Sequence, residues 1–143
     1  MIELQDNDYE DISVGHSFSF TRRITQDDVE AFAALSEDRN PLHLDASYAS
    51  KTVFRSRIVH GMLAASLFST LLGMLCPGKR NLYLSQTLNF RKPISPGSEL
   101  LVKGTVIKKI NSLKAIVIKT EIYVGPVLSV DGEAMVRVMP LPG

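Results

Sequence analysis

The sequence predicts a single α+β domain, in which one long apolar helix packs against a strongly curved antiparallel sheet. Two observations lead to this fold class. Residues 58–75 form the longest apolar run of the chain, and the turn-forming pair Pro77-Gly78 follows it. Almost everything after that run alternates polar and β-branched residues, in four segments separated by turn residues. A chain of 143 residues with 45% hydrophobic content can build one domain with a real core.

The first part of the chain predicts a tail, a strand and a short helix. Residues 1–11 are polar and acidic, and we expect them to form an N-terminal tail. Residues 17–24 alternate polar and apolar side chains, which is typical of a strand. Thr25 and Asp28 have the spacing of a capping box, so a helix is expected over residues 26–35.

A loop with three polar side chains follows that helix. Asp38, Asn40 and His43 lie within six residues of one another, with Pro41 between them. The proline ring fixes its own φ at about −65° and disfavours the helical conformation of the residue before it. We therefore expect Asp38 and His43 to lie on a bent loop and not on one helix face. Such a loop can direct both side chains at one small object, such as a water molecule.

The apolar run is expected to be the central helix of the domain. At a rise of 1.5 Å per residue, residues 58–75 would span about 25 Å. Polar residues within the run and the lack of a second span argue for a helix buried in the domain and against a membrane segment. Just before the run, residues 46–50 are expected to form one helical turn, capped by Asp45.

The C-terminal half predicts the strands of the sheet. Four segments carry β-branched alternation: residues 82–90, 99–110, 113–123 and 127–138. Turn-forming pairs separate them: Pro96-Gly97, Asn111-Ser112, Gly125-Pro126 and, within the last segment, Asp131-Gly132. Consecutive strands joined by short turns favour antiparallel pairing.

Composition excludes some classes of function. The formal net charge is only +1, from 16 basic and 15 acidic residues, so neither a nucleic acid nor another polyanion is expected as a partner. Cys76 is the only cysteine, which rules out an internal disulfide and a cysteine-based metal site. We expect a cytoplasmic protein, because a reducing compartment suits a single cysteine and the acidic N-terminus does not resemble a targeting peptide. The alternative is the mitochondrial matrix, if a transit peptide has been removed.

Four segments of the chain carry a resemblance to a known family: Ser36–Asp45 (SEDRNPLHLD), Phe54–Leu63 (FRSRIVHGML), Gln86–Phe90 with Pro93, and Gly132–Ala134. They resemble the (R)-specific enoyl-CoA hydratases, the MaoC-like dehydratases, and most of all those linked to polyhydroxyalkanoate synthesis. The resemblance begins at about Val14. It implies a MaoC-like hot dog domain over residues 12–143, with the sheet wrapped around the central helix, and a homodimer.

The resemblance also implies an activity, the reversible hydration of a trans-2-enoyl-CoA to the (R)-3-hydroxyacyl-CoA. Asp38 and His43 suit this reaction, because a carboxylate and an imidazole can hold one water and transfer its protons. Which of the two takes the proton stays open. Asn40 is expected to hold the loop or the water. The backbone N–H of Gly61, at the start of a helix, would stabilise the thioester oxygen. No metal or other cofactor is needed.

Four further residues are expected to bind the substrate. Ser69 and Leu72 are three residues apart and share a helix face, and in the resembling short-chain enzymes the equivalent positions line the acyl pocket. A leucine there would shorten the pocket, which favours short acyl chains. Val136 is a third candidate wall. For Ser69, simple helix packing is an equal alternative. His60 is interpreted mainly as structural, with contact to the substrate as the alternative.

Three other functions stay open on the sequence alone. One is a 3-hydroxyacyl-[acyl carrier protein] dehydratase, because the sequence does not identify the carrier of the thioester or the physiological direction. The second is a hot dog acyl-CoA thioesterase, although those enzymes lack the Asp-x-Asn-Pro-Leu-His arrangement. The third is a non-catalytic module that binds acyl thioesters. Fold alone would not separate these functions.

Overall fold

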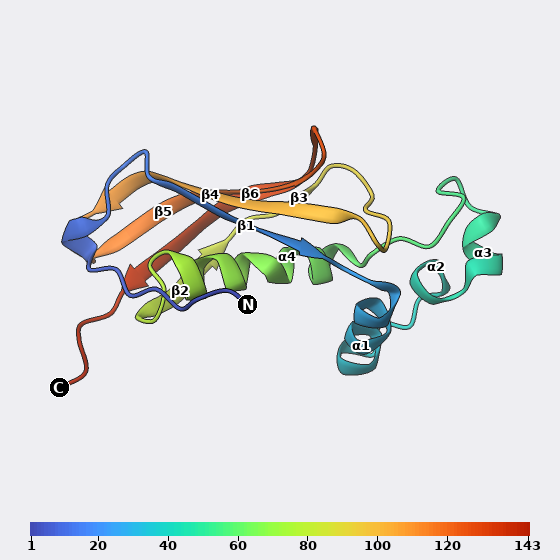
Figure 1. The fold of residues 1–143 in the computed structure, drawn as a ribbon, viewed down its shortest axis with the longest axis horizontal. Helices are drawn as coiled ribbons and strands as arrows, with labels where there is room; N and C mark the ends of the chain where they lie inside the picture. Colours follow the sequence, from blue (N-terminus) through green and yellow to red (C-terminus); the bar gives the residue numbers. More distant parts are fainter.

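The computed structural model describes residues 1–143, and it shows one antiparallel sheet with a long helix lying across it (Figure 1). The strands run in the order β1-β4-β5-β6-β2, and β3 also pairs with β6. Their bounds are β1 (Ser17–Arg23), β2 (Asn81–Gln86), β3 (Asn89–Phe90), β4 (Glu99–Ile110), β5 (Ala115–Val124) and β6 (Val127–Val138). The predicted α+β class, with an antiparallel sheet around a central helix, is confirmed.

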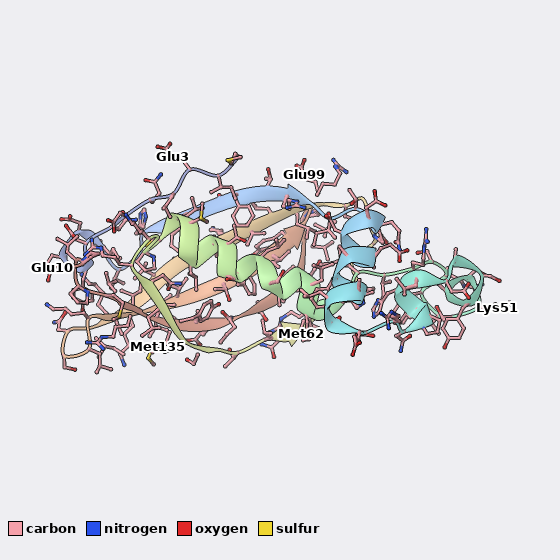
Figure 2. The ribbon with its side chains drawn as sticks, turned by 90° about the horizontal axis from the view of Figure 1, so that it is seen from below. Glu3, Glu10, Lys51, Met62, Glu99 and Met135 are labelled. Carbon is pink, nitrogen blue, oxygen red and sulfur yellow. The ribbon has the colours of Figure 1, made fainter.

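The central helix is α4 (Gly61–Thr70), which continues as the π-helical turn η2 (Leu71–Leu75) and lies along one face of the sheet (Figure 2). The prediction that this helix begins at Ile58 is wrong by three residues. The backbone N–H of Ile58 bonds to the Leu42 carbonyl at 3.3 Å, and that of Val59 to the Ile94 carbonyl at 2.8 Å. These distant partners hold the segment before Gly61 out of the helix. No helix in the structure combines the length and apolar character that crossing a membrane requires.

The core fills the space between the central helix and the sheet. The helix contributes apolar side chains that are less than a tenth exposed: Ala64, Leu67, Phe68, Leu71 and Leu72. The sheet contributes alternate residues of its strands, among them Leu100, Val102, Val106, Ile116, Ile118, Ile122 and Val136, all 0% exposed. The alternation follows from the strand period of two, which turns every second side chain to the same face. Full burial of each large apolar side chain contributes about 1.5–3 kcal/mol.

The N-terminal segment contacts the domain. The side chain of Asn7 donates to the Leu75 carbonyl at 2.9 Å. Tyr9 is only 6% exposed, and the ammonium of Lys109 lies 4.2 Å above its ring. The segment predicted as a tail, residues 1–11, is therefore held against the end of the central helix and the sheet through these contacts.

Three short helices extend beyond one end of the sheet, close to the start of α4 (Figure 1). They are α1 (Gln26–Ser36), α2 (Pro41–Leu44) and α3 (Ala46–Ser50). The predicted capping box is confirmed, because Thr25 Oγ1 accepts from the Asp28 N–H and the Asp28 carboxylate accepts from the Thr25 N–H. Asp45 caps α3 as predicted, by accepting from the N–H of Tyr48 at 3.0 Å. This helical region carries the polar loop.

Candidate active site

The polar loop is shaped by the turn from α1 to α2. Glu37 ends α1 in the left-handed conformation, with φ of 66°. Asn40 is extended, with φ −56° and ψ 130°, and its side chain accepts from the N–H of Leu42 at 3.0 Å, so it caps α2. Pro41 occupies the first helical position, where its missing N–H costs nothing. The expectation that His43 lies on a loop is therefore wrong, because Pro41 starts a short helix that carries it.

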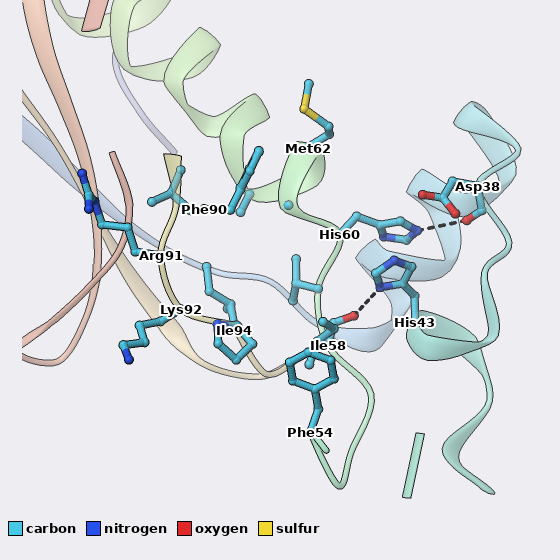
Figure 3. Close-up of a pocket in the computed structure, with 15 residues that line it drawn as sticks. Asp38, His43, Phe54, Ile58, His60, Met62, Phe90, Arg91, Lys92 and Ile94 are labelled. Carbon is cyan, nitrogen blue, oxygen red and sulfur yellow. Dashed lines mark hydrogen bonds between the residues drawn. The ribbon is translucent and has the colours of Figure 1, made fainter. Parts of the chain in front are cut away.

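Two hydrogen bonds to backbone carbonyls orient the imidazole rings of the site (Figure 3). His43 Nδ1 lies 2.8 Å from the Ile58 carbonyl oxygen, and His60 Nε2 lies 3.0 Å from the Asp38 carbonyl oxygen. A carbonyl oxygen can only accept, so these two nitrogens carry the ring protons. The free lone pairs of the neutral rings are consequently on Nε2 of His43 and Nδ1 of His60.

Asp38, His43 and His60 form one compact cluster. Their candidate ligand atoms lie within 4.8 Å of one another. The two imidazole rings stack, with centroids 3.8 Å apart and planes at 27°. Asp38 is exposed, His43 is half-buried, and His60 is 2% exposed. Imidazole lone pairs lie in the ring planes, so two stacked rings are poorly arranged to share one tetrahedral metal ion. A water between a carboxylate and an imidazole nitrogen fits the cluster better.

A cavity of about 470 Å³ opens beside this cluster (Figure 3). The cluster and Gly61 line one side of it. The other walls are mainly apolar, with Phe54, Ile58, Phe90, Ile94 and Val130 among them. Arg91 and Lys92 also line it, and Arg91 is already paired with Asp131 at 2.9 Å. A largely apolar cavity with a few convergent polar groups has the character of a ligand site, here for an apolar chain with a polar end.

Gly61 stands at the first position of α4, within the lining of the cavity. The first N–H groups of a helix have no partner inside it and lie at the positive end of its dipole. A Cβ on Gly61 would lie 2.8 Å from the ring of Phe90, closer than side chains tolerate. Only glycine therefore lets Phe90 pack against the start of the helix while leaving the backbone N–H open to an acceptor.

The structure does not bring the residues predicted for the acyl pocket into this cavity. Leu72 and Val136 are 0% exposed in the core, and Ser69 is exposed on α4. None of the three lines the cavity, and neither does Asn40, which caps α2. His60 does belong to the lining, with almost no exposed surface. The role of Ser69, Leu72 and Val136 in acyl-chain length stays a prediction.

Sequence reasoning missed the aromatic walls of the cavity. Phe54 and Phe90 are 41% and 53% exposed, which is unusual for phenylalanine outside a binding surface. Both lie in segments that carry the family resemblance, and this is the sequence feature that could have identified them as site residues. Phe90 reaches the start of α4 through a contact between distant parts of the chain, which no local pattern reveals.

Comparison with known proteins agrees with this fold. Residues 11–124 match the family model described as MaoC like domain. The chain is 44% identical to an (R)-specific enoyl-CoA hydratase of Aeromonas caviae, covering 88% of this chain and 95% of that protein. It is 34% identical to a mitochondrial 3-hydroxyacyl-[acyl-carrier-protein] dehydratase of Arabidopsis thaliana, covering 86% and 75%. The solved structure of an (R)-hydratase from Pseudomonas aeruginosa, unliganded, matches with a TM-score of 0.89 and 35% identity, over 98% and 96% of the two chains.

These matches extend over most of the chain, and they agree with the predicted hot dog architecture. The fold and the site define a domain of the hydratase and dehydratase type. The chain belongs to the MaoC-like domain family.

Proposed function

We propose that the protein catalyses the reversible hydration of a trans-2-enoyl-CoA to the (R)-3-hydroxyacyl-CoA. The observation that carries the proposal is the placement of the Asp38 carboxylate and the His43 imidazole at one end of an apolar cavity. Within the His43 ring, Nε2 is the atom that can exchange a proton with water, because Nδ1 is bonded to the Ile58 carbonyl. The 44% identity to an (R)-specific enoyl-CoA hydratase supports the same reaction.

Two proton transfers accompany the addition of water. The water held by Asp38 and His43 loses a proton as its oxygen bonds to C3 of the enoyl group, and C2 gains a proton. The side chain that takes this proton, the Asp38 carboxylate or Nε2 of His43, returns it to C2 directly or through the other side chain, and the geometry is compatible with either acceptor. Each positioned group of this kind contributes about 10²–10⁴-fold to the rate. Asn40 acts indirectly, because its cap sets the start of the helix that carries His43.

The thioester oxygen gains negative charge as water adds. The N–H of Gly61 at the start of α4 is the donor we assign to this oxygen. A backbone donor aimed at a developing oxyanion is worth about 2.7–4 kcal/mol of transition-state stabilisation. The neighbouring Phe90 ring would exclude water from this position, which strengthens the interaction.

We propose a short acyl chain for the substrate. Leu72 and Val136 are fully buried in the core and do not line the cavity, so the cavity does not extend as far as these two side chains. Ser69, one turn before Leu72, would stand at the same end of the acyl group. This assignment is tested by the chain-length experiment in the Discussion.

We propose that the protein works as a homodimer. β2 is the last strand of the sheet, so its outer edge has no partner in this chain. Large apolar side chains are exposed on and beside this edge: Met62, Leu82, Leu84 and Phe90, each between 43% and 59% exposed. A second copy could continue the sheet and cover these side chains. Light scattering on the purified protein at micromolar concentration should give twice 15.8 kDa, whereas a mass of 15.8 kDa would contradict the dimer.

The carrier of the thioester is proposed to be coenzyme A, and the site of action the cytoplasm. Lys92 is the only unpaired basic residue of the cavity lining, and one cation suits a small phosphate-bearing carrier better than an acidic protein surface. Cys76 is buried and free, which agrees with a reducing compartment. An acyl carrier protein as carrier, and the mitochondrial matrix as location, are the alternatives.

The test is to follow the loss of the conjugated thioester absorbance of crotonyl-CoA and to identify the product with an (R)-specific dehydrogenase. The same assay with crotonyl-acyl carrier protein determines the preferred carrier. Release of free thiol would instead indicate a thioesterase. Binding of enoyl-CoA without turnover of either substrate would indicate a non-catalytic module.

A further inference from the structure

His60 lies where the three parts of the proposed site meet. It is the residue before Gly61, at the cap position of α4, and its side chain makes no capping bond there. The ring is held between Phe32, at a centroid distance of 4.8 Å, and His43, at 3.8 Å. With 2% of its surface exposed, it offers almost nothing for a substrate to touch.

The hydrogen bond from His60 reaches the backbone of Asp38 and not its carboxylate. Nε2–H donates to the Asp38 carbonyl at 3.0 Å. The other bonds around Asp38 are local, because its N–H donates to Ser36 Oγ and its carboxylate accepts from the Asn40 N–H, both at 3.2 Å. Among these bonds, that from His60 is the one that ties the exposed Asp38 turn to the start of the central helix.

The ring of His60 has a second effect through its stacking on His43. The Nδ1 bond to Ile58 fixes one edge of the His43 ring, but rotation about that bond would still move Nε2. The face of His60, 3.8 Å away, blocks such a rotation on one side. The position of the proposed water therefore depends on His60 through both Asp38 and His43.

The other ring nitrogen of His60 indicates that packing of the ring alone does not explain a histidine at this position. Nδ1 is buried and has no hydrogen-bond partner. A buried acceptor without a partner is unfavourable, and a phenylalanine would fill the same space without that penalty. The bond made by Nε2–H is what the histidine supplies and phenylalanine would not.

We propose that His60 is a positioning residue, which holds Asp38 and His43 in the geometry of the hydration reaction without touching the reacting atoms. The proposal rests on the function proposed above. It develops the interpretation of His60 as mainly structural, and contact of His60 with the substrate is the alternative. It also links the dyad to Gly61 through the chain, since the residue directly before Gly61 contacts both the Asp38 turn and the His43 ring.

The test separates the hydrogen bond from the ring by substitution. His60→Gln keeps a donor at the place of Nε2 and removes the ring, whereas His60→Phe keeps the ring and removes the donor. His60→Asn is matched to His60→Gln, but its amide is too short to reach the Asp38 carbonyl. Val106→Ala is the control for stability, because it opens the core far from the site at a residue that is 0% exposed. All are assayed with crotonyl-CoA below their unfolding temperatures.

We expect kcat to fall by about 100-fold in His60→Phe and His60→Asn with KM within about twofold, the size of effect that a misplacement of catalytic groups by 1 Å produces. His60→Gln should recover about tenfold over His60→Asn, and Val106→Ala should keep kcat. If His60→Phe does not fold, the tenfold ratio of kcat between His60→Gln and His60→Asn tests the proposal without it.

Two results would overturn the proposal while leaving the function intact. A raised KM at unchanged kcat would show that His60 binds substrate. Equal kcat in the His60 variants and Val106→Ala would show a purely structural role. Absence of turnover in the wild-type protein would instead contradict the proposed function itself.

Discussion

The Nδ1 atom of His43 lies 2.8 Å from the carbonyl oxygen of Ile58, which stands three residues before the central helix. This bond joins the short helix α2 to the segment that leads into α4. It also fixes the tautomer of the ring, because the carbonyl can accept only from a protonated Nδ1. The basic Nε2 is thereby placed in the cluster with Asp38.

His43→Gln should lower kcat for crotonyl-CoA hydration by about 10²–10⁴-fold, because the amide cannot exchange a proton with water. His16→Gln is the matched control, since His16 is exposed and stacks only on Phe18. It should keep full activity. Steady-state kinetics on the two purified variants make the comparison, and an active His43→Gln enzyme would remove His43 from the reaction.

Gly61→Ala should lower both activity and stability. The added Cβ would lie 2.8 Å from the Phe90 ring, so the ring or the start of α4 must shift. A displaced oxyanion donor costs about 100-fold or more in kcat. The double variant Gly61→Ala with Phe90→Ala relieves the clash and should recover part of the rate. No recovery, with a restored unfolding temperature, would argue against the N–H of Gly61 as the donor.

Leu72→Ala should extend activity towards longer acyl chains, measured as the ratio of rates on C8 and C4 enoyl-CoA. The substitution removes a fully buried side chain and should also lower the free energy of unfolding by about 2–5 kcal/mol. Leu71→Ala is the control, because Leu71 is equally buried on the same helix and was not assigned to the acyl pocket. An unchanged C8 to C4 ratio in Leu72→Ala would contradict the assignment.

Cys76 should react slowly with thiol reagents in the folded protein at pH 8. Burial raises the pKa of its thiol from 9.0 to about 11, so the thiolate is scarce at that pH. The raised pKa means that the folded state holds this proton more tightly than the unfolded state. Its contribution to stability is therefore complete below pH 9 and is lost as the pH rises towards 11. Iodoacetamide labelling with and without urea measures the difference, and equal rates would show an accessible thiol.

The sequence predicts the local parts of this structure well. The capping box of Thr25 and Asp28 needs only neighbouring residues, and it forms as expected. The strands at residues 99–110 and 127–138 have the expected bounds, because alternation and turn residues both mark them. In these places the local pattern and the tertiary fold favour the same conformation.

What the sequence does not reveal depends on partners that are distant along the chain. The apolar run begins at Ile58, but the carbonyl groups of Leu42 and Ile94 accept hydrogen bonds from the backbone there. The helix therefore begins only at Gly61. The motif brings attention to His43 and His60 without predicting that their rings stack. The motif residues could be found from sequence, while the contacts that orient them required the structure.

We propose that Asp38 and His43 act together on one water, and the hydration of crotonyl-CoA by Asp38→Asn beside the wild type tests this most directly. Asn at this position keeps the shape of the side chain and the bond from the Asn40 N–H, but its neutral amide cannot take up and release a proton as the carboxylate can. Asp45→Asn, which retains a helix cap, is the matched control. We expect rapid formation of the (R)-product by the wild type and the control, and a loss of about 10²–10⁴-fold in Asp38→Asn. Wild-type rates in Asp38→Asn would contradict the joint action of Asp38 and His43.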